Sequence, residues 1–165
     1  MVFASGVADR MTENLICESP EKTFEAGERL GASLAGGDMV LLYGGLGAGK
    51  TLFTKGILST LGYDIDEVTS PSFALVNLYP AECFDVYHID LWRLDSGQDI
   101  VTAVGLNEIL EVEGVVTIIE WAERLGDAEP GQKVIRVKIG GEGDEPRTIT
   151  ITHRGDNADV AAGKS

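Results

Sequence analysis

Short, continuous runs of apolar residues predict the strands of this chain. The runs at 39–43 and 114–121 carry apolar side chains at successive positions, which is typical of strands covered on both faces of a sheet. Two further runs, at 73–79 and 83–90, predict strands that are joined by a turn containing Pro80. We therefore expect a sheet whose central strands are buried on both sides.

Alternation with a period of two replaces these runs near the end of the chain. Residues 133–139 and 147–152 alternate between apolar and polar side chains on either side of the turn-rich segment GGEGDEP. This pattern predicts an antiparallel hairpin with one buried face. We expect residues 1–154 to form a single domain that opens with a loose leader, residues 1–12, and we expect residues 155–165 to be a disordered tail.

Helical spacing of apolar residues occurs between the predicted strands. The first helix is predicted to begin after Ser19, which suits the N-cap position, and to end at the glycine pair 36–37. A second helix is predicted over about 50–61, and weaker helical patterns occupy 95–112. Strands and helices that follow one another in this way are typical of an α/β fold.

The composition restricts the partners that the chain is able to bind. The 165 residues include 27 Asp and Glu against 13 scattered Lys and Arg, a formal net charge of −14. Nucleic-acid binding through a basic surface is therefore excluded, because it requires clustered positive charge. We find neither a membrane span nor an export signal, and the two cysteines lack metal-ligand spacing, so we expect a cytoplasmic protein.

The segment GGLGAGKT, residues 44–51, matches the phosphate-loop pattern G-x-x-x-x-G-K-[ST] completely. A predicted buried strand leads into it and a predicted helix leaves it. In this setting backbone N–H groups from Leu46 to Thr51 would surround a β-phosphate at the positive end of the helix dipole. Lys50 would neutralise the β- and γ-phosphates, and the Thr51 hydroxyl would bind Mg²⁺. The sequence predicts binding of ATP or GTP.

The phosphate loop also refines the expected fold class. We expect an α/β, P-loop NTPase-like domain of three layers, with a mixed, mostly parallel central sheet and a C-terminal antiparallel hairpin.

Two acidic residues at predicted strand ends are candidates for completing the Mg²⁺ site beside Thr51. Asp90 ends the strand CFDVYHID, and Glu120 ends the very apolar strand VVTIIE. A buried carboxylate at the centre of a sheet needs a reason such as a cation. Both residues therefore remain candidates for the metal site.

Three nearby residues permit more than one interpretation. His88 fits a hydrogen-bonded core position as well as a functional one. Trp121 would either pack in the core or stack on a base or a partner. Arg93 would contact phosphate or pair with an acid.

Motifs that are missing help to distinguish between reactions. The guanine-binding string N-K-x-D and the GTPase string D-x-x-G are both absent, and the seven arginines do not form the pair expected of a kinase lid. The segment TSPSF, residues 69–73, places hydroxyls where nucleotide switches contact the γ-phosphate. We therefore expect a compact ATPase that signals to another protein. The alternative is a self-sufficient P-loop kinase of small molecules.

Five segments occur in a fixed order: GGLGAGKT, TSPSFALVNLY, YHIDLWRL, GLNEIL and IEWAERL. In their order and spacing they resemble the TsaE (YjeE) family of bacterial ATPases, from about Ser19 to Arg124. The resemblance implies an ATPase that is weak alone and uses ATP and Mg²⁺. It also implies TsaD and TsaB as partners, which install threonylcarbamoyl on adenosine 37 of tRNAs that read ANN codons. The tRNA would be held by those partners, and no membrane would be involved.

Matching positions in the resemblance, together with the switch-like segment, give a set of expected site residues. Lys50, Asp90 and Glu120 are expected to take part in catalysis, and Thr51, Asp90 and Glu120 to bind the metal ion. Residues expected to bind nucleotide are Ser19, Thr23, Gly45, Leu46, Gly47, Ala48, Gly49, Lys50, Thr51, Thr69 and Ser70.

The chain departs from the family pattern at three positions. It has Ser72 where the family usually has Thr, and Trp92 where the family usually has Tyr, so the hydroxyl and the aromatic ring are kept. It has Gly45 where the family usually has Asp. The loss of a carboxylate beside the phosphates puts in doubt any role of that position in partner contact or in restraining hydrolysis.

Overall fold

The computed structural model describes residues 11–68, 76–94, 100–126 and 133–153. In chain order the described elements are β1 Met11–Cys17, α1 Pro20–Gly31, β2 Met39–Tyr43, α2 Lys50–Thr60, the 3₁₀ turn η1 Ile65–Glu67, β3 Val76–Tyr79, β4 Val86–Asp90, α3 Ile100–Val104, α4 Leu106–Leu110, β5 Val116–Glu120, the 3₁₀ turn η2 Ala122–Leu125, β6 Val134–Gly140 and β7 Arg147–His153. None of the described helices has the length and apolar character that crossing a membrane requires.

The described strands form one seven-stranded sheet in the order β1-β7-β6-β2-β5-β4-β3. Its centre is parallel, because β2 pairs in parallel with β6 and β5, and β5 pairs in parallel with β4. Antiparallel pairs form both edges: β3 with β4 on one side, and β7 with β6 and β1 on the other. The expected mixed sheet and C-terminal hairpin are confirmed.

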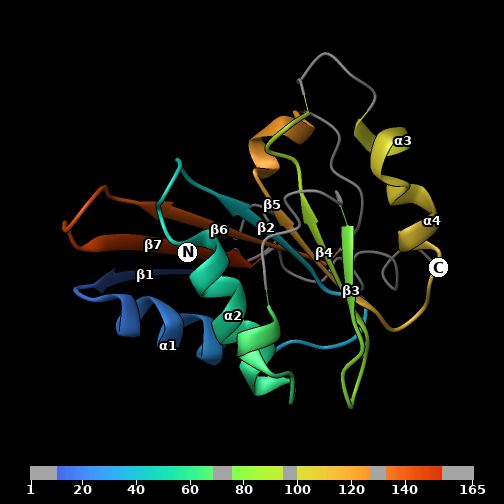
Figure 1. Ribbon diagram of the computed structural model, residues 1–165, viewed down its shortest axis with the longest axis horizontal. Coiled ribbons are helices and arrows are strands. Elements are labelled where there is room, and N and C mark those ends of the chain that lie inside the picture. Colours follow the sequence, from blue (N-terminus) through green and yellow to red (C-terminus); the bar gives the residue numbers. More distant parts are fainter. Residues whose placement is uncertain (1–10, 69–75, 95–99, 127–132, 154–165) are drawn as a thin grey trace, which may run out of the picture.

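Helices cover both faces of this sheet and make the three layers of Figure 1. Along β2, Val40 and Leu42 belong to the core beneath α1 and α2, whereas Met39 and Leu41 belong to the core beneath α3 and α4. Successive side chains of a strand point to opposite faces, so a strand between two cores must be apolar at every position. The continuous apolar run at 39–43 has this cause.

The first helix begins where the sequence predicts and ends earlier. The Ser19 side chain caps α1 by accepting a hydrogen bond from the Lys22 N–H, with Pro20 in the first turn. The helix ends at Gly31 and does not continue to the glycine pair 36–37, which corrects that prediction. After Gly31 the backbone tightens into bonds between residues three apart, because the Ser33 N–H donates to the Leu30 carbonyl at 2.9 Å and the Leu34 N–H to the Gly31 carbonyl at 3.2 Å.

Strand β1 corrects the prediction that residues 1–12 are a loose leader, since the strand begins at Met11. It pairs along its whole length with β7, from Met11 opposite His153 to Cys17 opposite Arg147. Met11 and Ile16 are both 73% exposed. Because apolar side chains also lie on the solvent side, the alternation that would reveal a strand is obscured. Residues 1–10 and the tail 154–165 lie outside the described residues.

Helices α1 and α2, which cover the same face of the sheet, cross at Gly27 and Gly56. A Cβ atom on Gly27 would lie 2.2 Å from the Phe53 carbonyl oxygen, and one on Gly56 would lie 2.2 Å from the Phe24 carbonyl oxygen. Backbone therefore meets backbone at this crossing, and a side chain would separate the helices. Because α2 starts in the phosphate loop, this contact also brings the start of α1 close to the loop.

We predict that Gly27→Ala lowers the free energy of unfolding by about 2 kcal/mol or more, because the added methyl group overlaps the Phe53 carbonyl. Gly140→Ala is the matched control, since its Cβ would have no contact nearer than the Thr148 carbonyl at 4.0 Å. It should change stability by no more than about 0.5 kcal/mol. Urea unfolding of the two variants measures both values, and equal losses would contradict the close helix crossing.

Candidate functional site

The phosphate loop, residues 44–51, connects the end of β2 to the first turn of α2. Gly47 and Gly49 have φ angles of 73° and 112°, in the region that favours glycine. Gly49 directly precedes α2, so this conformation turns the backbone into the helix. The first N–H groups of a helix lack partners within it and carry the positive end of its dipole. The turn is therefore suited to binding an anion.

The Lys50 side chain is fixed above the loop before any ligand binds. Its Nζ donates to the carbonyl oxygens of Gly44 and Gly45 at 2.7 and 2.8 Å, and lies 4.1 Å from the centroid of the Trp121 ring. Burial lowers the pKa of the Lys50 ammonium from its ordinary value, and the carboxylates of Glu120, Glu123 and Asp90 oppose that shift. A phosphate beside Nζ would favour the charged form further.

Glu120 lies against the loop and is bonded on both sides. Its Oε1 accepts a hydrogen bond from the Thr51 hydroxyl at 3.1 Å, and its Oε2 lies 2.8 Å from His88 Nε2. Glu120 is 2% exposed and His88 is fully buried. The other ring nitrogen, His88 Nδ1, has no hydrogen-bond partner among the described residues. The arrangement therefore assigns the Nε2–H tautomer, in which the ring donates to the carboxylate.

Parallel strand pairing places these groups at one edge of the sheet. Glu120 stands opposite Leu42 of β2 and opposite Asp90 of β4, so the carboxyl ends of three strands meet beside the loop. Asp90 Oδ1 accepts a hydrogen bond from the Trp92 N–H at 2.9 Å, which turns this carboxylate toward the following loop. Of the two acidic candidates, Glu120 is the one bonded to Thr51.

Two tryptophans close the side of the site beside Lys50. Trp121 has a φ angle of 57°, the one positive value that a non-glycine residue takes in the described chain. Its ring lies 4.5 Å from that of Trp92, centroid to centroid. A bulky residue in the left-handed region is strained, and such strain is found at functional sites. Trp121 thus both packs against the core beneath α3 and α4 and contacts the Lys50 ammonium.

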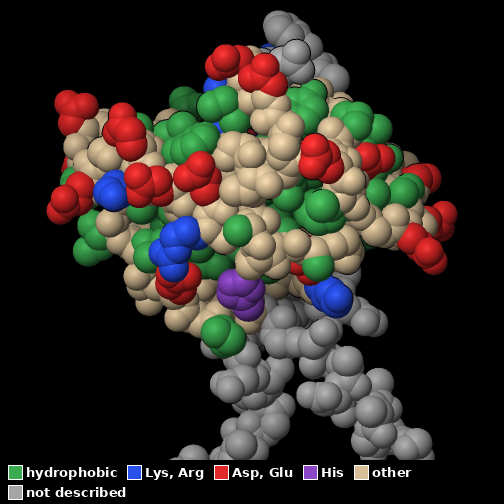
Figure 2. Space-filling view, turned by 90° about the horizontal axis from the view of Figure 1, so that it is seen from below, with side chains coloured by type: hydrophobic (Ala, Val, Ile, Leu, Met, Phe, Trp, Pro, Cys, Tyr) green, Lys and Arg blue, Asp and Glu red, His purple; other side chains and the backbone are tan. Residues whose placement is uncertain are grey.

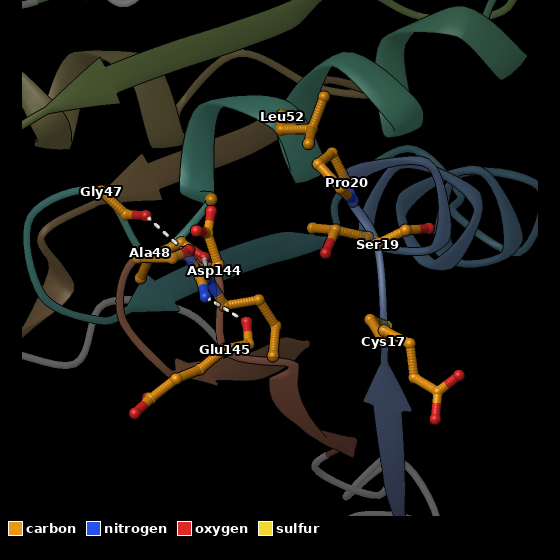
Figure 3. A pocket seen from close by; sticks show the side chains of 13 residues that line it. Cys17, Ser19, Pro20, Gly47, Ala48, Leu52, Asp144 and Glu145 are labelled. Atoms are coloured by element: carbon orange, nitrogen blue, oxygen red, sulfur yellow. Dashed lines mark hydrogen bonds between the residues drawn. The ribbon is translucent and has the colours of Figure 1, made fainter.

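A pocket of about 290 Å³ opens on the other side of the loop (Figure 3). It lies between the loop, the start of α1 and the turn between β6 and β7. Its lining residues are Cys17, Glu18, Ser19, Pro20, Thr23, Gly47, Ala48, Gly49, Leu52, Gly143, Asp144, Glu145 and Arg147. The pocket adjoins the phosphate loop and has room for a group attached to a bound phosphate.

Most of the residues expected at the site lie around the loop. Lys50, Thr51 and Glu120 come together, Ser19 and Thr23 line the adjoining pocket, and Asp90 stands on the next strand. The expected loop residues 45–49 also surround the site, and the Leu46 side chain is 78% exposed. Thr69 and Ser70, with the rest of the switch-like segment, lie outside the described residues. Arg93 is exposed in the turn after β4.

Two residues at the loop escape prediction from sequence. Glu123 accepts a hydrogen bond from the Gly44 N–H at 3.4 Å. Arg147, at the start of β7, donates to the carbonyls of Gly47 and Ala48. These partners lie 79 and about 100 residues away along the chain, so no local spacing reveals them.

A phosphate loop between a central parallel strand and a helix, with a carboxylate of the adjacent strand on its threonine, defines a P-loop NTPase-like α/β domain. The model of the family described as threonylcarbamoyl adenosine biosynthesis protein TsaE matches residues 17–149. The chain belongs to the TsaE family.

Individual relatives are similar to this protein over most of its chain. A protein of Bacillus subtilis (strain 168) named tRNA threonylcarbamoyladenosine biosynthesis protein TsaE is 34% identical over 143 residues, 86% of either chain. A protein of the same name from Rickettsia bellii is 34% identical, over 87% of this chain and 96% of its own. The crystal structure of Bacillus subtilis YdiB superposes with a TM-score of 0.67 at 29% identity, over 94% of this chain and 93% of that one.

We predict that His88→Leu lowers the free energy of unfolding by about 2–4 kcal/mol, because Glu120 loses the donor to Oε2 and stays buried. Glu120→Leu and the double variant complete a double-mutant cycle, measured by urea unfolding. The coupling energy between the two positions should be at least about 1 kcal/mol. Additive losses would contradict a hydrogen bond between these side chains.

Proposed function

We propose that the protein binds and hydrolyses ATP as a subunit required for forming threonylcarbamoyladenosine at position 37 of tRNAs that read ANN codons. The observation that carries the proposal is the buried Glu120 carboxylate on the Thr51 hydroxyl of a complete phosphate loop. Membership of the TsaE family supports the place of this site in tRNA modification. The reaction would take place in the cytoplasm.

In this proposal the loop and Lys50 hold the phosphates of ATP. Loop N–H groups would contact the β-phosphate, and Lys50, already placed by two carbonyls, would contact the β- and γ-phosphates. A water molecule would attack the γ-phosphate, and partner contact would organise its position. The nucleoside would occupy the pocket beside Ser19 and Thr23, which adjoins the loop.

The oxygen donors of Thr51 and Glu120 fit Mg²⁺, which prefers one or two protein oxygens together with phosphate and water. Within the described residues there is no cluster of three or more His, Cys, Asp or Glu side chains, so a cage built from protein alone is not formed. When bound, the ion would neutralise charge on the β- and γ-phosphates. Asp90 would act from the neighbouring strand, as the acid that corresponds to a Walker B residue.

We propose that TsaD-like and TsaB-like proteins are the partners, and that the tRNA is reached only through them. Figure 2 shows Asp and Glu side chains scattered over the face in view, with few Lys and Arg between them. This charge pattern repels a nucleic-acid backbone, in keeping with a net charge of −14. The threonylcarbamoyl transfer itself would belong to the partners.

We expect the purified protein to hydrolyse ATP slowly alone and faster with TsaD-like and TsaB-like proteins of the same organism. Phosphate release measures hydrolysis, nucleoside analysis of the tRNA measures the product, and pull-down with ATP, ADP or no nucleotide measures assembly. The alternative is a self-sufficient small-molecule kinase. Rapid ATP turnover by this protein without any partner protein, with labelled phosphate appearing on a metabolite, would support the kinase. It would contradict the proposal that the protein acts as a subunit of a complex.

We predict that Glu120→Gln lowers Mg²⁺-dependent hydrolysis by the assembled complex at least about 100-fold, because the metal site loses its charged oxygen. Asp90→Asn should lower it less, about tenfold, because this carboxylate already accepts the Trp92 N–H. Asp85→Asn, an exposed acid beside the start of β4, is the control and should match the wild type.

Calorimetric titration of Mg²⁺ in the presence of ADP gives a second measurement, independent of turnover. The apparent Mg²⁺ affinity should fall with Glu120→Gln and stay unchanged with Asp85→Asn. If Glu120→Gln leaves both activity and Mg²⁺ affinity unchanged, the assignment of Glu120 to the metal site is wrong.

A further inference from the structure

Arg147 has an unusual set of partners for a charged side chain beside the phosphate loop. Its Nε donates to the Ala48 carbonyl at 3.0 Å and its Nη2 to the Gly47 carbonyl at 3.3 Å. The same guanidinium donates to the Gly143 and Glu145 carbonyls of the β6–β7 turn, at 3.0 and 2.6 Å. Figure 3 shows Gly47, Ala48 and Glu145, whose carbonyls accept bonds from Arg147, at the wall of the pocket.

Every recorded partner of this guanidinium is a backbone carbonyl. Among the described residues no carboxylate lies within the 4.0 Å of an ion pair with Arg147, although the chain is strongly acidic. The planar guanidinium presents several donors in a fixed fork, so it is able to join the loop and the turn at once.

The backbone around Arg147 is shaped to admit the side chain. Gly141 has a φ angle of 122°, and a Cβ atom there would lie 2.7 Å from the Pro146 carbonyl oxygen and 3.0 Å from Arg147 Cδ. A side chain at position 141 would therefore displace the arginine or the turn. The hairpin turn curls around the arginine, and the glycine makes the space for it.

The bonds to Gly47 and Ala48 act on the part of the loop that would contact phosphate. In a planar trans peptide the C=O and the following N–H point in opposite directions. Holding the Ala48 carbonyl therefore directs the Gly49 N–H away from Arg147, whereas the Ala48 N–H donates to the Gly45 carbonyl at 3.2 Å. The guanidinium thus helps to set the orientation of the Gly49 amide.

We infer that Arg147 is a positioning residue that ties the β6–β7 turn to the phosphate loop and preorganises the loop for the β-phosphate. The inference rests on the proposed nucleotide site, but the loop order that it describes is a property of the free protein. Preorganisation raises affinity because less conformational entropy is lost on binding.

We expect Arg147→Gln to increase hydrogen exchange of the amides at 46–49 about tenfold in the nucleotide-free protein, without changing exchange in the middle of α2. ADP should bind about tenfold more weakly, whereas AMP, which lacks the β-phosphate, should bind as to the wild type. Arg147→Lys keeps the charge and loses the fork, so it should behave like Arg147→Gln. Arg29→Gln, an exposed arginine on α1, is the control and should change neither quantity.

Three results would overturn the inference. Unchanged loop exchange and ADP affinity in Arg147→Gln would exclude a positioning role. Full recovery of ADP affinity by Arg147→Lys would assign the effect to charge alone. Equal weakening of AMP and ADP would place the effect on the nucleoside side of the pocket. If Arg147→Gln does not fold, Gly141→Ala, which displaces the arginine without removing it, should produce the same pattern, and wild-type behaviour would overturn the inference.

The experiment also separates this inference from the proposed function. If the wild type does not bind ADP, the proposed nucleotide site fails, whereas hydrogen exchange of the loop still decides whether Arg147 orders it.

Discussion

The buried carboxylate of Glu120 is the constraint on which the site depends. A carboxylate that is 2% exposed needs donors on its oxygens, and it finds them in the Thr51 hydroxyl and the His88 ring. One donor belongs to the first turn of α2 and the other to β4, while the acid itself ends β5. Its hydrogen bonds therefore fix the phosphate loop relative to two parallel strands.

Two further contacts hold the loop from the opposite side. The glycine crossing of α1 and α2 lets the start of α1 approach the loop, so that Ser19 and Thr23 form one wall of the pocket. The Arg147 guanidinium forms another wall and bonds to the loop carbonyls. The phosphate loop is thus supported by side chains from strands on both sides of β2, Glu120 of β5 and Arg147 of β7. The glycines of the loop supply its conformational freedom.

Much of this arrangement is predictable from the sequence because its signals are local. The loop pattern is contiguous, and apolar-rich segments that predict strands end in Asp90 and Glu120. Pairing of parallel strands then brings those acids together. The features that escape prediction depend on distant segments. Strand β1 is defined by pairing with β7, and the role of Arg147 by partners about 100 residues away along the chain. Local patterns do not encode such contacts.

The space around Gly45, where the family usually has Asp, shows what the missing carboxylate changes in the loop. Among the described residues, no atom lies within 4 Å of the place that a Cβ atom on Gly45 would take, so a side chain there would leave the packing of this part of the structure unchanged. The carboxylates that act on Lys50 come from Glu120, Glu123 and Asp90, and Glu123 also accepts the Gly44 N–H. Negative charge around Lys50 therefore persists without an acid at position 45. What the glycine removes is a charge on the outer surface of the loop, which is the surface that an approaching protein would meet.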